Sequence, residues 1–286
     1  MLVERIVIYG RMIKFSHSVF ALPFAFSGAA LAALEAEIRL AQVFWIVVAM
    51  VGARSAAMGF NRLVDREIDA ANPRTAAREL PLGRISPAAV RVLVAFSSAA
   101  LILAAWRLNP LCFALSPVAL GIVFVYSYTK RFTWATQFFL GLALSVAPIG
   151  AWIAIAGSLD AEILLLGGAV LAWVSGFDII YACQDVEFDR GHGVYSIPQR
   201  FGVLRGLAIA RALHAISFLL MVAVGVLFGL GIVYAAGLVF VAGLMVYEHR
   251  LVRPDDFSKL GVAFMNVNAA ISAVFFVFTL GDVLWR

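Results

Sequence analysis

The stretch LAQVFWIVVAMVGARSAAMGFNRLVDREID, residues 40–69, is apolar for most of its length and strongly charged at its end. Residues 40–61 hold a single charged side chain, Arg54, and have the length of about 17 to 25 residues that crosses a bilayer as an α-helix. The polar residues from Asn61 to Asp69 would then lie at a membrane surface. The stretch therefore predicts a transmembrane helix that carries carboxylates to one side of a membrane.

Apolar runs of this kind recur along the whole chain. Hydrophobic residues make up 63% of its 286 residues and charged residues only 14%, and the mean hydropathy is +0.97, which is outside the range of soluble domains. The runs are too long and too apolar on every face for the alternating strands of a membrane barrel. The sequence thus predicts an all-α, polytopic membrane protein with nine transmembrane helices, at 16–36, 40–61, 86–106, 110–127, 135–156, 161–183, 205–228, 231–247 and 262–284.

Basic residues are distributed unevenly between the two sides of these helices. On one side, which includes the N-terminus and the loops at 62–86 and 184–204, there are 18 Lys and Arg residues, against 3 on the other. Because basic loops stay in the cytoplasm, we expect the acidic motifs to face the cytoplasm from the inner membrane. The net charge of +5 is explained by this bias and by attraction to anionic lipid, so no nucleic-acid partner is predicted. We expect one domain over 1–286 and infer no obligate protein partner.

Polar side chains at the end of the first stretch recur at helical spacing. Asn61, Asp65 and Asp69 follow one another at intervals of four residues, which places them on one face of an α-helix. Arg54 lies on the same face, two turns deeper in the predicted span. One side of this helix therefore carries its strongly polar groups.

A second stripe of the same kind ends the predicted span at 161–183. Tyr181, Asp185 and Asp189 recur at intervals of four residues, and Asp178 precedes them on the same face. If both helices end on the same side of the membrane, their acidic ends can face each other across one pocket.

Carboxylates this close together repel one another and are costly at membrane depth, so the two stripes imply bound cations. They offer oxygen atoms without His or Cys, which favours a hard divalent ion. Mg²⁺ fits best, because it is commonly held by a few carboxylates together with substrate phosphate oxygens. Glu67 and Glu187 point to other helix faces and are not expected to join the site.

Basic side chains near both motifs indicate an anionic substrate, and a magnesium diphosphate would fit. Arginine binds phosphate oxygens in a bidentate manner, and lysine acts as a point charge. The candidates for this role are Arg62, Arg66, Arg74, Arg78, Lys130 and Arg131. The alternative is the ordinary excess of cytoplasmic basic residues, which we favour for Arg84, Arg91, Arg205, Arg211, Arg250 and Arg253.

Polar residues deeper in the stripes have more than one interpretation. Arg54 is costly inside a membrane helix and needs either a polar cavity or a carboxylate partner such as Asp178. Asp178 can bind metal, pair with Arg54 or orient an acceptor. Tyr126 and Tyr181 lie near the same helix ends and offer ring faces that would stabilise a carbocation.

Together these motifs resemble a known family. The patterns Asn-x-x-x-Asp-x-x-x-Asp at 61–69 and Asp-x-x-x-Asp at 185–189 look like the paired signature of the UbiA superfamily of intramembrane prenyltransferases. The resemblance extends over nearly the whole chain. Features shared with its 4-hydroxybenzoate polyprenyltransferase branch are Arg54 before Asn61, the loop at 72–83, Tyr126-x-x-x-Lys130-Arg131, and Ser196 with Phe201-Gly202.

The resemblance implies a fold, a reaction and a set of roles. It implies nine helices around a central cavity capped on the cytoplasmic side, and transfer of a prenyl group from polyprenyl diphosphate to an aromatic acceptor. Magnesium, as two ions, would be bound by Asp65, Asp69, Asp185 and Asp189, with Asn61 assisting. The diphosphate would be held by Arg62, Arg66, Lys130 and Arg131.

The acceptor has two candidates. The run at 14–24 departs from the usual start of ubiquinone-pathway enzymes and resembles a bacterial subgroup of which part serves menaquinone synthesis by the futalosine route. We slightly favour 4-hydroxybenzoate over a dihydroxynaphthoate, and Arg54 or Arg11 would pair with the carboxylate of either. The alternative from another class is an ion-coupled transporter, since carboxylates inside membranes also mark ion pathways.

Overall fold

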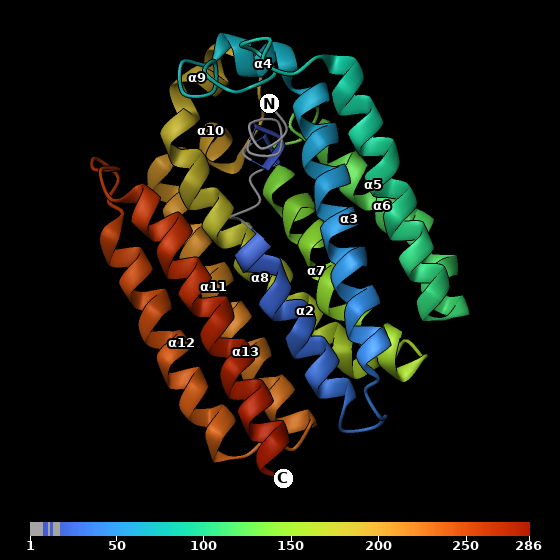
Figure 1. The fold of residues 1–286 in the computed structure, drawn as a ribbon. Coiled ribbons are helices and arrows are strands. Elements are labelled where there is room, and N and C mark those ends of the chain that lie inside the picture. The colour runs from blue at the N-terminus through green and yellow to red at the C-terminus, as the bar shows by residue number, and fades with distance from the viewer. Residues whose placement is uncertain (1–7, 11, 14–17) are drawn as a thin grey trace.

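The structure is a computed structural model that describes residues 8–10, 12–13 and 18–286. Regular structure in this part of the chain is helical, and the long helices run side by side in one bundle (Figure 1). The main helices are α2 (Ser18–Ala32), α3 (Leu40–Val64), α5 (Pro87–Leu108), α6 (Pro110–Thr129), α7 (Thr136–Ala156), α8 (Ala161–Ala182), α11 (Val203–Leu227), α12 (Ile232–Leu251) and α13 (Asn268–Trp285). The short ones are α4 (Arg66–Ala71), the 3₁₀ helix η2 (Cys183–Asp185), α9 (Val186–His192), α10 (Ile197–Phe201) and the π-helix η3 (Val262–Val267).

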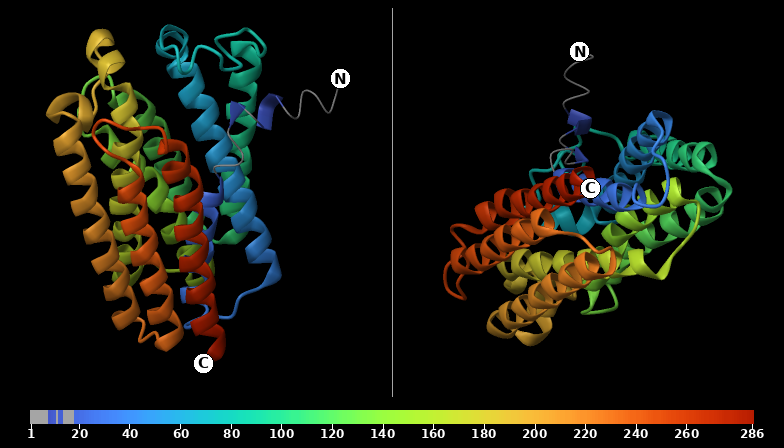
Figure 2. Two further views of the ribbon diagram at one scale, coloured as in Figure 1. Left: turned by 90° about the vertical axis from the view of Figure 1, so that its left-hand side faces the viewer. Right: turned by 90° about the horizontal axis from the view of Figure 1, so that it is seen from below.

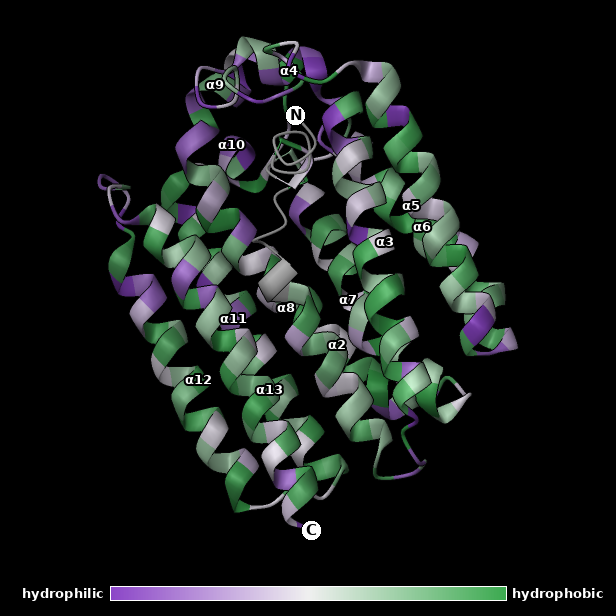
Figure 3. Cartoon of the chain, in the orientation of Figure 1, coloured by the Kyte–Doolittle hydropathy of each residue, from purple (hydrophilic) through white to green (hydrophobic). Residues whose placement is uncertain are grey.

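The prediction of an all-α membrane protein is confirmed. Within the described residues, 8 helical segments are long and apolar enough to cross a membrane, and α2 is a shorter apolar helix. Eight of the predicted spans correspond to these long segments and the first corresponds to α2, so the count of nine holds only if the shorter α2 is included. The start of the first span, residues 16 and 17, lies outside the described residues. Hydrophobic residues follow the long helices, whereas hydrophilic ones gather at the end that carries α4 and α9, here called the polar end (Figure 3).

Local signals explain where several helices begin and end. α5 begins after Ser86, whose hydroxyl accepts a hydrogen bond from the Ala89 backbone N–H at 3.2 Å. α6 begins after Asn109, whose side chain accepts from the Cys112 N–H at 2.8 Å, and proline is the first residue of both helices. α7 ends at Gly157, where φ is 78° and glycine is favoured. These caps set the ends of the spans independently of packing.

The helix α8 is the most deeply buried of the spans found among the described residues. It packs against α7 and α11, and 72% of its apolar span is buried, against at most 44% in the other spans found among the described residues (Figure 2). Trp173 of α8 packs on Phe24 of α2, with ring centroids 5.0 Å apart, and Phe24 stacks on Phe275 of α13 at 5.1 Å. The helix that carries the second acidic motif is therefore held from several sides.

Close packing of α2 against α7 depends on Gly28. A Cβ atom at this position would lie well inside van der Waals contact of the Pro148 backbone carbonyl, which cannot move aside as a flexible side chain would. We expect Gly28→Ala to destabilise the protein by about 2 kcal/mol and to lower its melting temperature in detergent. Gly121→Ala is the control, because a Cβ there meets nothing within 4 Å. Equal melting temperatures for the two variants would contradict the packing described.

Candidate active site

Both acidic motifs interrupt the helix that carries them. The chain leaves α3 at Asp65, with φ −90° and ψ 4°, and resumes as α4. Asp185 has nearly the same conformation, φ −102° and ψ 3°, between α8 and α9. The predicted stripes therefore run across a break, because each helix bends at its first aspartate. The two bends are alike, and both lie at the polar end.

One cavity of about 670 Å³ contains both motifs. Its walls come mainly from α3, α5, α6, α7 and α8. At the polar end it is lined by Asn61, Arg62, Asp65, Asp69, Asn72, Arg74, Thr75, Arg78, Lys130, Tyr181, Asp185, Asp189 and Ser196. Away from that end the lining becomes apolar, with Ile46, Met50, Leu108, Leu115, Ile153 and Leu164. As the helical spacing predicts, the two stripes line the same cavity, and Glu67 and Glu187 are not among its lining residues.

Asp65 is almost completely buried, at 2% exposure, and is paired with two cations. The Lys130 ammonium lies 2.6 Å from Oδ2, and Nη1 of Arg131 lies 3.1 Å from Oδ1. Asn61, one turn earlier on α3, donates a hydrogen bond to Oδ2 at 2.9 Å. Arg131 also donates to the Val64 carbonyl at 2.7 Å. The connection after α6 is thus fixed to the end of α3.

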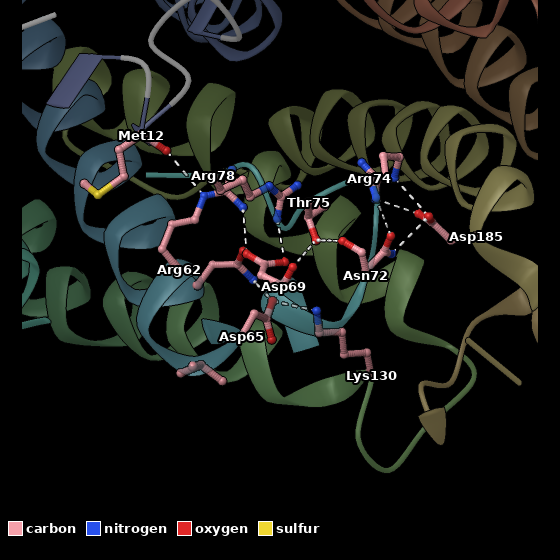
Figure 4. A network of polar contacts seen from close by, with 12 residues as sticks. Met12, Arg62, Asp65, Asp69, Asn72, Arg74, Thr75, Arg78, Lys130 and Asp185 are labelled. Atoms are coloured by element: carbon pink, nitrogen blue, oxygen red, sulfur yellow. Dashed lines mark hydrogen bonds and ion pairs between the residues drawn. The ribbon is translucent and has the colours of Figure 1, made fainter. Parts of the chain in front are cut away.

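Asp69, on α4, is buried in a similar way. Arg78 donates to Oδ1 at 2.6 Å, and Nη1 of Arg62 lies 3.6 Å from Oδ2. Arg62 is itself 4% exposed and donates to the Met12 carbonyl at 3.4 Å. Thr75 donates to the Asp69 backbone carbonyl at 2.9 Å, which ties the following loop to α4. Figure 4 shows these side chains pointing toward one another from α3, α4 and the loop.

Asp185 is held by Arg74 in a bidentate pair. Nε and Nη2 of Arg74 lie 2.9 and 2.6 Å from the two carboxylate oxygens, and Nη1 donates to the Tyr181 hydroxyl at 2.9 Å. Asn72 adds a hydrogen bond to Oδ1 at 3.3 Å. Burial lowers the pKa of Arg74, but the hydrogen bond from its guanidinium to Asp185 and the nearby negative charges more than offset this, so the pKa is raised overall. Arg74 therefore stays charged.

The loop after α4 joins the two motifs. Arg78 contacts Asp69 of the first motif, while Arg74, four residues earlier, contacts Asp185 of the second (Figure 4). A second link runs from the backbone N–H of Tyr195 to the Lys130 carbonyl, at 2.8 Å. Segments that follow α4, α6 and α9 thus meet over the polar end of the cavity.

The oxygen-only donor set of the two motifs fits a hard divalent ion. One acceptor, Oδ2 of Asp69, is buried and receives no hydrogen bond from the described residues. In the part of the chain that the structure describes, however, no group of three His, Cys, Asp or Glu side chains is close enough to hold a metal. Three of the four predicted metal-binding aspartates instead pair with Lys or Arg, and Asp189 accepts a hydrogen bond from Ser196 at 3.2 Å.

Not every predicted residue lines the cavity. Arg54, Tyr126 and Asp178 do, below the acidic motifs. Arg66 does not: its guanidinium is half exposed and lies 3.6 Å from Glu67. Arg131 is also not a lining residue; its guanidinium instead donates a hydrogen bond to Asp65. Arg11 falls outside the described residues.

Several cavity residues were not singled out from the sequence. In the sequence, Asn72 stands out only as the first residue of the loop at 72–83, although an amide near two acidic motifs is a usable signal. Gln137 accepts from the Ile197 N–H at 3.1 Å and supports the segment after the second motif. Phe264 enters the cavity from η3, far along the chain, and nothing in the local sequence marks it among 23 phenylalanines.

Comparison with known proteins identifies the family of proteins in which this cavity occurs. A family model described as the UbiA prenyltransferase family matches residues 21–270. The chain belongs to the UbiA prenyltransferase family. The matched range includes both acidic motifs and the loop between α6 and α7. This UbiA-family protein is therefore a polyprenyltransferase and an integral membrane protein, and the transporter alternative is set aside.

Curated relatives of this prenyltransferase are bacterial enzymes. It is 35% identical over 251 residues to the 4-hydroxybenzoate octaprenyltransferase of Aeromonas salmonicida strain A449, covering 86% of each chain. It is 32% identical over 228 residues to the 4-hydroxybenzoate octaprenyltransferase of Vibrio atlanticus strain LGP32, covering 80% of each.

Solved structures show the same fold. The apo structure of a UbiA homologue from Aeropyrum pernix K1 matches with a TM-score of 0.84 and 33% identity, covering 93% of this chain and 98% of that one. A UbiA homologue from Archaeoglobus fulgidus, solved with bound GPP and Mg²⁺, matches with a TM-score of 0.69 and 18% identity, covering 97% and 99%. At 18% identity the second match is evidence for a shared fold alone.

Proposed function

We propose that this prenyltransferase transfers a polyprenyl group from polyprenyl diphosphate to the ring of 4-hydroxybenzoate, in the synthesis of a respiratory quinone. The observation that carries the proposal is the two-part cavity. Its polar end gathers acidic and basic side chains from both motifs, and the same cavity continues into an apolar part. A donor with a charged head and a long hydrocarbon tail has this distribution of polarity. The names of the curated relatives support the acceptor and a long polyprenyl chain.

The polar end would bind the head of the donor. Asn61, Asp65, Asp69, Asp185 and Asp189 would hold two Mg²⁺ ions, which when bound would neutralise the charge that develops on diphosphate as it leaves. The cations that line the same end would take up diphosphate oxygens: Arg62, Arg74, Arg78 and Lys130. Arg131 would act indirectly, by holding Asp65. When the allylic C–O bond breaks, its electron pair leaves with the diphosphate.

The deeper part of the cavity would hold the prenyl cation and the acceptor. Tyr126 lines it and Tyr181 lines the adjoining polar end, and their ring faces would stabilise the cation. Arg54 would pair with the carboxylate of the acceptor, and Asp178 would orient its hydroxyl group. An acceptor ring carbon then attacks the cation, and loss of the proton from that carbon restores aromaticity. Exclusion of water by the apolar walls prevents hydrolysis of the cation.

Orientation in the membrane follows from the distribution of basic residues. Their excess on the side of the two motifs favours an enzyme of the bacterial inner membrane whose polar end faces the cytoplasm. Surrounding lipid and the two substrates are then the expected partners. A dihydroxynaphthoate acceptor for menaquinone remains the second candidate, because Arg54 would pair with its carboxylate equally well.

A turnover assay with purified protein tests the proposal. Labelled geranyl diphosphate is offered with 4-hydroxybenzoate or with dihydroxynaphthoates, in the presence of Mg²⁺ or of a chelator. We expect prenylated 4-hydroxybenzoate and diphosphate in equal amounts, and no product with the chelator. Product from the naphthoates alone would favour the second acceptor, and no release of diphosphate with any acceptor would refute the assignment.

A further inference from the structure

A second group of buried polar side chains lies behind the cavity wall, where α11, α12 and the start of α13 meet. Glu248 and Asn268 are completely buried, and His214 is 2% exposed. A carboxylate and an amide inside a membrane protein are costly unless their polar atoms find partners. These residues take no part in the chemistry proposed above, so their presence needs another reason.

Asn268 connects this group to the π-helix η3. Its side-chain Nδ2 donates to Glu248 Oε1 on α12 at 2.8 Å. The same nitrogen lies 3.1 Å from the Ala263 carbonyl and 3.3 Å from the Phe264 carbonyl, both in η3. A π-helix displaces backbone groups from the α-helical register, and such turns occur frequently at functional sites. Asn268 therefore ties the widened turn to α12.

The other carboxylate oxygen of Glu248 lies near a pair of histidines. Its Oε2 lies 3.6 Å from Nδ1 of His214, and Nε2 of His249 lies 3.0 Å from the same His214 nitrogen. The second nitrogen of His214 lies 3.2 Å from the Trp173 carbonyl on α8. Glu248 therefore lies beside a hydrogen-bonded histidine pair that links α11 to α12 and α8, so the acceptor for Asn268 belongs to a buried junction of these three helices.

The widened turn places Phe264 in the cavity wall. Its ring centroid lies 4.2 Å from that of Tyr181, with the ring planes 33° apart. The Tyr181 hydroxyl accepts a hydrogen bond from Arg74 at 2.9 Å, and Arg74 forms the bidentate pair with Asp185. A continuous series of contacts therefore runs from Glu248 to the second acidic motif.

We propose that Glu248 and Asn268 are positioning residues for the diphosphate site: they hold η3 so that Phe264 stays packed on Tyr181, which keeps Arg74 aligned with Asp185. This inference rests on the proposed function, which assigns Arg74 and Asp185 to the head group of the donor. The ligand that reports the effect is a prenyl diphosphate.

Asn268→Leu tests the inference, because it removes the donor and keeps a side chain of similar size. We expect the KM for geranyl diphosphate to rise about tenfold, with a similar loss of affinity for the unreactive geranyl S-thiolodiphosphate, and an unchanged KM for the acceptor. Ser217→Ala is the matched control. Ser217 is equally buried and donates to the Ala169 carbonyl of α8 at 2.8 Å, so its loss should lower the melting temperature without changing the donor KM.

A double-mutant cycle separates positioning from general loosening of the bundle. In a Phe264→Ala background, Asn268→Leu should have no further effect on the donor KM, because the contact that it maintains is already lost. The same tenfold change in both backgrounds would overturn the proposal. Glu248→Gln keeps the oxygen that accepts from Asn268 and should keep the wild-type KM, so a raised KM in this variant would also overturn it.

Two further outcomes keep the test decisive. If Asn268→Leu does not accumulate in the membrane, Phe264→Ala alone serves, since an unchanged donor KM in that variant contradicts the inference. If the wild-type enzyme is active and Asn268→Leu has the same donor KM, this inference is refuted and the proposed function is not affected. A wild-type protein that releases no diphosphate would refute the proposed function itself.

Discussion

Asp65→Asn is expected to lower turnover of geranyl diphosphate and 4-hydroxybenzoate by about a thousandfold or more. The substitution keeps the shape of the side chain but removes the charge that pairs with Lys130 and Arg131 and one of the oxygens offered to Mg²⁺. Both cations remain in partial contact with solvent, with side-chain exposures of 24% and 34%, so we expect the variant to stay folded. Diphosphate release at saturating substrate is the measurement, with the melting temperature in detergent alongside.

Glu67→Gln is the matched control for this variant. Glu67 lies two residues away, its side chain is 89% exposed, and it does not line the cavity. Its replacement should leave turnover within about twofold of the wild type, as is usual for exposed sites away from function. Asp185→Asn, in the second motif, should behave like Asp65→Asn. Near-normal turnover in both aspartate variants would remove the basis for the magnesium assignment.

Arg74→Gln is expected to lower kcat/KM for the donor by about a hundredfold. Arg74 contacts Asp185 through two nitrogens and Tyr181 through a third, and it lies on the loop that joins the motifs. Its loss would leave Asp185 without this cation and would remove a donor for the diphosphate oxygens. Steady-state kinetics with varied geranyl diphosphate measure the effect, which should fall mainly on the donor KM.

Two companion variants sharpen this prediction. Arg74→Lys keeps the charge but cannot form the bidentate pair, so it should recover only part of the lost kcat/KM. Arg84→Gln removes an exposed cation at the end of the same loop and should leave the kinetics unchanged. Equal losses of kcat/KM in Arg74→Gln and Arg84→Gln would contradict this prediction. They would mean that the loop cations act only through their summed positive charge and not through the specific contacts of Arg74.

The fold and the position of the motifs were predictable because they depend on local patterns. A run of apolar residues long enough to span a bilayer predicts a helix in lipid, whatever surrounds it. Intervals of four residues place Asn61, Asp65 and Asp69 on one helix face, and the structure finds all three on the wall of one cavity. The bends at Asp65 and Asp185 were not predictable, since spacing alone does not distinguish a continuous helix from two short ones.

The pairing of individual charges lies beyond such patterns. Lys130 is 65 positions from Asp65, and Arg74 is 111 positions from Asp185. Periodicity relates residues three or four positions apart, and says nothing about which loop cation reaches which acid. For the same reason, the half-exposed Arg66 could not be told from its neighbour Arg62, which is buried against Asp69.

The sequence by itself determined that this protein is a helical membrane protein with two acidic motifs at one surface and cations beside them, because hydropathy and helical spacing are local properties of the chain. Only the tertiary structure decided that the loop after α4 spans both motifs through Arg74 and Arg78. It alone placed Phe264 of the π-helix against Tyr181. Those contacts join distant segments, and they form only when α8 packs between its neighbours and brings the segments together.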